Sequence, residues 1–174
     1  MQVTVLAGGI GAARFLRGLV SATGSTHDKP SVTVIGNTGD DIRLFGLQIC
    51  PDLDSVMYTL GGGADEERGW GRANESFTVL EELRGYGAKP DWFGLGDRDI
   101  ATHLVRTQAL DAGYRLSTVT AGLCERWQLP VSLIPMTDDR VETHVVIDDP
   151  DTGQPAAIHF QEWWVRHRAA VAAR

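Results

Sequence analysis

The sequence predicts an α/β fold with a mainly parallel sheet, and three features near its start carry that prediction. A β-branched apolar run from Val3 to Ala7 is followed directly by a glycine-rich turn and then by a helical pattern of apolar residues. The polar stretch 21–30 separates this helix from a second apolar run, Val32 to Ile35. Because a strand–helix–strand unit joins strands that run in the same direction, we expect the two strands to pair in parallel.

The middle of the chain has the pattern of helices separated by glycine-rich turns. We expect a helix from Pro51 to Leu60, with acidic residues in its first turn, and a second from Glu75 to Tyr86 capped by Asn74. The polar, glycine-rich residues 64–73 between them suggest a mobile surface loop. A further helix is expected from Ile100 to Ala112.

In this last helix we expect the apolar Leu104, Val105 and Leu110 to face the core. Another helix should begin with Ser117 as its cap and end near Trp127.

Strands and one final helix are expected in the last third of the chain. The predicted strands are Val131–Ile134, Glu142–Ile147 and Ala156–Phe160, and the last two are joined by a hairpin turn at 151–153. A helix should follow from about Gln161. Because no linker or repeat interrupts the chain, we expect residues 1–174 to form a single domain.

Composition excludes several classes of protein. The formal charge of −7, from 23 acidic and 16 basic residues, argues against a nucleic-acid partner. No run approaches the ~20 apolar residues of a membrane helix, and no charged leader precedes the first strand, so a cytoplasmic location without a membrane partner is expected. Cys50 and Cys124 lie outside any paired motif and are expected to be free, partly buried thiols.

The first glycine turn approximates a dinucleotide-binding pattern, with Gly9, Gly11 and then Arg14 in place of the third glycine. Backbone N–H groups at the start of the following helix would attract a phosphate, and Arg14 could add a guanidinium contact. A purely structural tight turn would leave the same pattern. A dinucleotide-dependent oxidoreductase is a further alternative, which the arginine weakens.

Asn37 and Asp40 follow the second strand, at the edge of the sheet where ligands of open parallel sheets bind. Asp40 with Asp52 or Asp54 could supply the oxygen ligands that Mg²⁺ prefers. The alternative is that Asp52 and Asp54 act only as acidic residues in the first turn of their helix.

A second polar group combines Asp97, Arg98, Asp99 and His103. Asp99 and His103 are four residues apart and share a helical face, which permits acid/base chemistry. A capped helix with a solvated histidine would have the same spacing.

Near the end of the chain, Trp163 and Trp164 are typical of a core or an interface, although they could also stack on a planar ligand.

Together these motifs resemble one family, the 2-phospho-L-lactate and phosphoenolpyruvate transferases of coenzyme F-420 biosynthesis, in its actinobacterial branch. The resemblance covers nearly the whole chain. The matching stretches are Val5-Leu6-Ala7-Gly8-Gly9-Ile10-Gly11, Asn37-Thr38-Gly39-Asp40-Asp41, Ile49-Cys50-Pro51-Asp52-Leu53-Asp54, Gly69-Trp70-Gly71, Asp91-Trp92-Phe93-Gly94-Leu95-Gly96-Asp97-Arg98-Asp99-Ile100-Ala101-Thr102-His103, Pro135-Met136-Thr137-Asp138-Asp139 and His159-Phe160-Gln161-Glu162-Trp163-Trp164.

The resemblance implies a Rossmann-like three-layer fold and a magnesium-dependent transferase. Such an enzyme moves a phosphoenolpyruvyl, or else a phospholactyl, group from its guanosine diphosphate conjugate to the deazaflavin Fo and releases GMP. Asp40 and Asp54 would be the catalytic and magnesium-binding residues, although Asp54 could instead bind Fo and Asp40 could act as the base. The implied substrate-binding residues are Gly8, Gly9, Gly11, Arg14, Asn37, Asp97, Arg98 and His103.

Members of this family are considerably longer than 174 residues. We therefore expect the chain to be the amino-terminal portion of the transferase, with its fold truncated at the carboxyl end. A noncatalytic fragment that binds a nucleotide or deazaflavin is an alternative. Small molecules are the expected partners, and a homodimer is left open.

Overall fold

The computed structural model describes residues 2–23, 31–150 and 152–174. A parallel three-stranded sheet has the order β1–β2–β5, with Val3 opposite Val32 and Val34 opposite Leu133. Its strands are β1 (Gln2–Ala7), β2 (Ser31–Gly36) and β5 (Ser132–Pro135), and α1 (Gly9–Thr23) connects the first two. The predicted α/β class and parallel pairing are confirmed.

Two antiparallel hairpins and four more α-helices complete the described structure. The helices are α2 (Pro51–Leu60), α3 (Thr78–Gly85), α4 (Asp97–Asp111) and α5 (Leu116–Trp127). One hairpin pairs β3 (Ile42–Leu44) with β4 (Leu47–Ile49), and the other pairs β6 (His144–Asp148) with β7 (Pro155–His159). The π-helix η1 (Glu162–Arg166) follows β7. None of the helices within the described ranges is long and apolar enough to cross a membrane.

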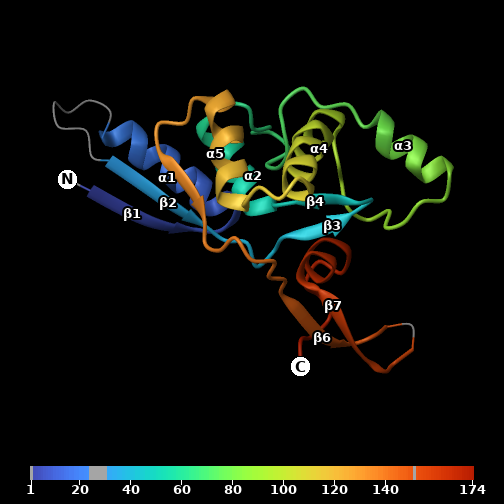
Figure 1. The fold of residues 1–174 in the computed structure, drawn as a ribbon. Helices are drawn as coiled ribbons and strands as arrows, with labels where there is room; N and C mark the ends of the chain where they lie inside the picture. Colours follow the sequence, from blue (N-terminus) through green and yellow to red (C-terminus); the bar gives the residue numbers. More distant parts are fainter. Residues whose placement is uncertain (1, 24–30, 151) are drawn as a thin grey trace.

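The main core lies on the face of the sheet covered by α1, α2 and α5 (Figure 1). Val34 of β2, Leu16 of α1 and Leu53 of α2 are almost completely buried there. On the opposite face Leu6 is 78% exposed and Ile134 is 44% exposed, so helices of the described residues cover one face of the sheet. The second helical layer of a three-layer fold would lie over this open face.

The buried face of α4 is polar, and the prediction that Leu104 and Val105 face inward is wrong. These two side chains are 44% and 54% exposed. Leu110 does pack against the core, as expected. The buried positions of the helix are instead Thr102, His103, Arg106 and Thr107. They face inward because they pair with buried polar groups of β4 and α2, such as the Gln48 N–H that donates to Thr107 Oγ1 at 2.8 Å.

The ends of α3 and α5 also differ from the predictions. Asn74 adopts a left-handed conformation outside α3 and does not cap it. Asp97 takes this role, because its carboxylate accepts hydrogen bonds from the N–H groups of Thr78 at 3.2 Å and Val79 at 3.0 Å. At α5, the N–H of Ser117 donates to Asp138 at 2.7 Å, so Ser117 is inside the helix. Both caps come from distant parts of the chain.

The β6–β7 hairpin projects away from the helices and is tied to the loop after β2 (Figure 1). The Thr143 N–H donates to the Gly39 carbonyl at 2.7 Å, and the Phe160 N–H donates to the Thr143 carbonyl at 2.8 Å. The helix expected from Gln161 is present as a short π-helix. The hairpin turn is as predicted except at Asp151, which is outside the described residues. This attachment brings η1 next to Asp40.

Candidate active site

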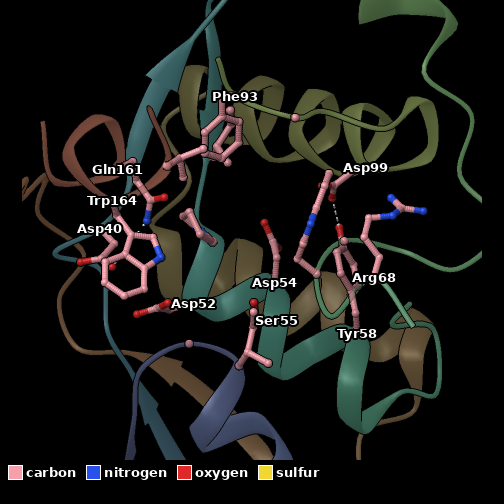
Figure 2. Close-up of a pocket in the computed structure, with 18 of the residues that line it drawn as sticks. Asp40, Asp52, Asp54, Ser55, Tyr58, Arg68, Phe93, Asp99, Gln161 and Trp164 are labelled. Carbon is pink, nitrogen blue, oxygen red and sulfur yellow. Dashed lines mark hydrogen bonds between the residues drawn. The ribbon is translucent and has the colours of Figure 1, made fainter. Parts of the chain in front are cut away.

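A cavity of about 1090 Å³ opens between the glycine turn, α2, α4 and η1. Figure 2 shows carboxylates reaching it from several elements: Asp40 and Asp52 on one side, Asp54 near the middle and Asp99 across from them. Its wall residues are Gly8, Gly9, Ile10, Gly11, Asp40, Ile49, Pro51, Asp52, Asp54, Ser55, Tyr58, Arg68, Trp70, Gly71, Phe77, Leu80, Arg84, Trp92, Phe93, Gly94, Asp99, His103, Phe160, Gln161, Trp164 and Val165.

The glycine turn packs directly against the Asp52 carboxylate. Gly9 begins α1 with a φ of +66°, a conformation that favours glycine. A Cβ added at Gly8 or at Gly9 would lie 3.3 Å from an Asp52 oxygen, so a larger residue would press on that carboxylate. Burial raises the pKa of Asp52, although hydrogen bonds from Asn37 and from the Gly9 backbone act to lower it. The turn therefore presents backbone N–H groups and a partly desolvated carboxylate to the same end of the cavity.

Asn37 joins Asp40 and Asp52 into one acidic group. Its Nδ2 donates to Asp52 at 2.8 Å and to Asp40 at 3.3 Å, while its Oδ1 accepts the Gly39 N–H at 3.0 Å. Gln161 Nε2 lies 3.5 Å from the other Asp40 oxygen. Burial raises the pKa of Asp40, opposed by the Asn37 hydrogen bond and the nearby His159. Within the described ranges, neither carboxylate forms an ion pair.

Asp54 belongs to a second group, in which its charge is neutralised by a buried arginine. Arg106 contacts both carboxylate oxygens through Nη1 and Nη2, with Nη1 at 3.1 Å from Oδ2. Arg106 is 1% exposed, and its Nη1 also lies 3.3 Å from the Gln48 carbonyl. The prediction paired Asp54 with Asp40, but the structure places the two residues in separate hydrogen-bonded groups of one cavity.

His103 lies between Asp54 and Asp99. Its Nδ1 is 3.1 Å from Arg106 Nη1 and 3.7 Å from Asp54 Oδ2. Nε2 faces an Asp99 oxygen at 3.5 Å, and Tyr58 Oη donates to the same oxygen at 2.6 Å. Burial raises the pKa of Asp99, but the neighbouring His103, the hydrogen bond from Tyr58 and the charge of Arg106 outweigh it, so this pKa lies below its usual value.

One group of three side chains in the described part of the chain has the arrangement of metal ligands. Asp54, Asp99 and His103 each offer an atom, and these atoms all lie within 4.8 Å of one another. Arg106 already supplies a cation to this group, which disfavours a second positive charge there.

Asp41, which directly follows the wall residue Asp40, is a buried carboxyl group. Asp41 is 5% exposed, and its Oδ1 has no hydrogen-bond partner among the described residues. Burial raises the pKa of Asp41 to about 7, although a hydrogen bond with Cys50 opposes the shift. Cys50 and Cys124 are free thiols, as predicted, and they are buried more fully than expected.

Several of the predicted site residues line the cavity, and others do not. Gly8, Gly9, Gly11, Asp40, Asp54 and His103 are wall residues, and Asn37 binds two of the wall carboxylates. Asp97 instead caps α3, and the exposed Arg98 contributes its backbone to contacts with Glu75 and Arg72. Arg14 lines a separate hollow of about 290 Å³ beside Arg17.

The sequence reasoning missed Tyr58, Arg106 and Gln161. The first two follow a helical signal, because Tyr58 is one turn after Asp54 and Arg106 is three residues after His103. Gln161 reaches Asp40 only through the attachment of the hairpin, for which the sequence has no local signal.

Comparison with known proteins places the chain in a family. Residues 3–174 match the model of the family described as "2-phospho-L-lactate transferase CofD". A phosphoenolpyruvate transferase from Thermobifida fusca is 65% identical over 99% of this chain and 54% of its own length. One from Streptomyces griseus is 64% identical over the whole chain and 53% of its length, and one from Mycolicibacterium smegmatis is 59% identical over 98% of the chain and 54% of its length.

The chain thus spans about half the length of the curated relatives it matches. Among solved structures, a Bacillus halodurans protein aligns with 90% of this chain and 45% of its own, at 16% identity and a TM-score of 0.49. The match to the family model extends over nearly every residue, and the relatives agree with it. The chain therefore belongs to the 2-phospho-L-lactate transferase CofD family.

Proposed function

We propose that this chain, as a single domain, forms the amino-terminal portion of a phosphoenolpyruvate transferase. It would help to move a phosphoenolpyruvyl group from its guanosine diphosphate conjugate to the deazaflavin Fo, with release of GMP. The observation that carries the proposal is the cavity, which combines the glycine turn with four carboxylates inside a chain of this family.

In this reaction a hydroxyl oxygen of Fo forms a bond to the phosphorus of the transferred group. The phosphorus–oxygen bond to the GMP portion breaks, GMP leaves with the bonding electrons, and the hydroxyl proton passes to solvent water. Positioning and charge neutralisation supply most of the rate for this class of chemistry. Asp54 is suited to accept the hydrogen bond of the hydroxyl, because Arg106 fixes both of its oxygens. The N–H groups of the glycine turn would hold the donor's phosphates.

Magnesium fits the group of Asp40 and Asp52 better than it fits Asp54. The first two carboxylates are partly desolvated, share one amide donor and form no ion pair within the described residues. A hard divalent ion would relieve this arrangement. Bound there, Mg²⁺ would supply neutralisation of the donor's phosphate charge. Asp54 already has Arg106 as its partner.

The test of the function is GMP release when the chain is mixed with Fo, Mg²⁺ and the guanosine diphosphate conjugate of phosphoenolpyruvate. Release above the protein-free rate supports a transferase. Binding of Fo in calorimetry without GMP release would instead favour a noncatalytic binding unit. This alternative is motivated by the match to only about half the length of the relatives. Absence of both would refute the proposal.

The magnesium assignment has its own test. Asp40→Asn and Asp52→Asn should each weaken Mg²⁺ binding at least about 10-fold in calorimetry, since each removes one of two anionic ligands. Asp111→Asn is the control, because Asp111 is exposed and is not a wall residue of the cavity. Equal Mg²⁺ affinity in all three variants would contradict the assignment.

A further inference from the structure

Trp164 is a large aromatic side chain that the fold leaves uncovered at a cavity wall. It is 58% exposed, although it lies on the short π-helix that follows the β6–β7 hairpin. Its neighbour Trp163 is half-buried and donates from Nε1 to the Val171 carbonyl at 2.8 Å. Trp163 thus serves the packing of the chain end, whereas Trp164 faces the cavity.

The indole ring of Trp164 lies nearly parallel to the ring of Phe160. It is offset-stacked on Phe160, with ring centroids 6.3 Å apart and an angle of 12° between the planes. Phe160 is in turn anchored by its N–H, which donates to Thr143 at 2.8 Å. π-Helical turns are frequent at functional sites, and this one presents a pre-oriented aromatic surface.

The surroundings of the ring restrict what can cover it. Figure 2 shows Trp164 beside Asp40 and Gln161, on the side of the cavity away from Asp99. Because Asp40 and Asp52 are acidic, an anionic group next to the indole would be repelled unless a cation accompanied it. Phe93 adds a further aromatic wall residue. A neutral, flat, partly apolar group fits these constraints best.

We propose that Trp164 is a stacking platform for the planar heteroaromatic ring of a substrate. The identity of that ring rests on the proposed function, which offers two of them: the deazaflavin of the acceptor and the guanine of the donor. Both are planar heteroaromatic rings that can stack on an indole, and binding measurements with each ligand show which of the two Trp164 contacts.

The experiment is calorimetry of the whole chain with Fo and, separately, with GMP. Trp164→Ala should weaken binding of one of the two ligands about 5- to 150-fold, the range expected when one ring loses its aromatic partner. Trp164→Phe should remain within a few-fold of the wild type, because it retains a flat ring. Loss with Fo alone identifies the deazaflavin, and loss with GMP alone identifies guanine.

Tyr114→Ala is the matched control, since Tyr114 is 61% exposed and is not a wall residue. Urea unfolding of each variant shows whether the chain remains folded, and quenching of tryptophan fluorescence that is lost in Trp164→Phe locates the ligand at this ring. The platform is refuted if Trp164→Ala binds both ligands as the wild type does, or if the wild type binds neither. GMP release by the wild type in the first case would leave the proposed function standing.

Discussion

Arg106 offers the sharpest test of the buried network, because its removal would strand a charge. Its guanidinium is the ion-pair partner of Asp54, and the two side chains are 2% and 6% exposed. In Arg106→Met the apolar stem is largely retained, but the Asp54 carboxylate loses its cation and the Gln48 carbonyl loses a donor. Removing one partner of a buried ion pair costs about 3–5 kcal/mol.

We therefore expect the free energy of unfolding of Arg106→Met to fall by about 3–5 kcal/mol, measured by urea denaturation at pH 7. The double variant with Asp54→Leu should recover at least half of the loss, because it removes the stranded carboxylate. Arg43→Met is the matched control. Arg43 and Asp111 are 45% and 60% exposed, and such a surface pair contributes less than about 1 kcal/mol.

The reasoning would be refuted if Arg106→Met cost less than about 1 kcal/mol, or if the double variant were no more stable than the single one. The first result would mean that Asp54 is solvated despite its burial. The second would mean that packing of the arginine stem, and not charge, accounts for the loss.

Two further predictions concern stability. Since burial raises the pKa of Asp41 to about 7, the folded state binds this proton more tightly than the unfolded state does, so wild-type stability should fall as the pH rises from about 4 through 7. Between pH 5 and pH 8 the free energy of unfolding should fall by roughly 2.7 kcal/mol, because about two pH units separate pH 5 from the folded pKa of about 7. Urea denaturation should show this fall, and Asp41→Asn should largely remove it; equal falls in both proteins would contradict the prediction. Gly63→Ala should destabilise the fold by about 1–3 kcal/mol, because its Cβ would lie 2.1 Å from the Trp127 ring. Gly122→Ala, in open space on α5, should instead be neutral or slightly stabilising in the same assay.

Local sequence patterns determined those helices and strands whose boundaries depend on residues close to them in the sequence. The strand, glycine turn and helix at the start of the chain follow from periodicity and glycine placement, and α2 begins and ends where predicted. The closeness of Asn37 and Asp40 to the glycine turn also followed, because the parallel pairing of β1 with β2 brings the carboxyl ends of both strands to one edge. Such signals need no knowledge of distant contacts.

Only the tertiary structure decided what depends on partners far apart in the sequence. The hydrophobic pattern of α4 pointed Leu104 and Val105 inward, but the helix buries His103 and Arg106, because Asp54 requires a charged partner more than Leu104 requires burial. The same holds for Asp97, which caps a helix that ends before it. The inward face of α4 was thus selected by the need to pair a buried charge, and not by helical periodicity. Leaving a buried carboxylate unpaired costs more free energy than exposing an apolar side chain to water.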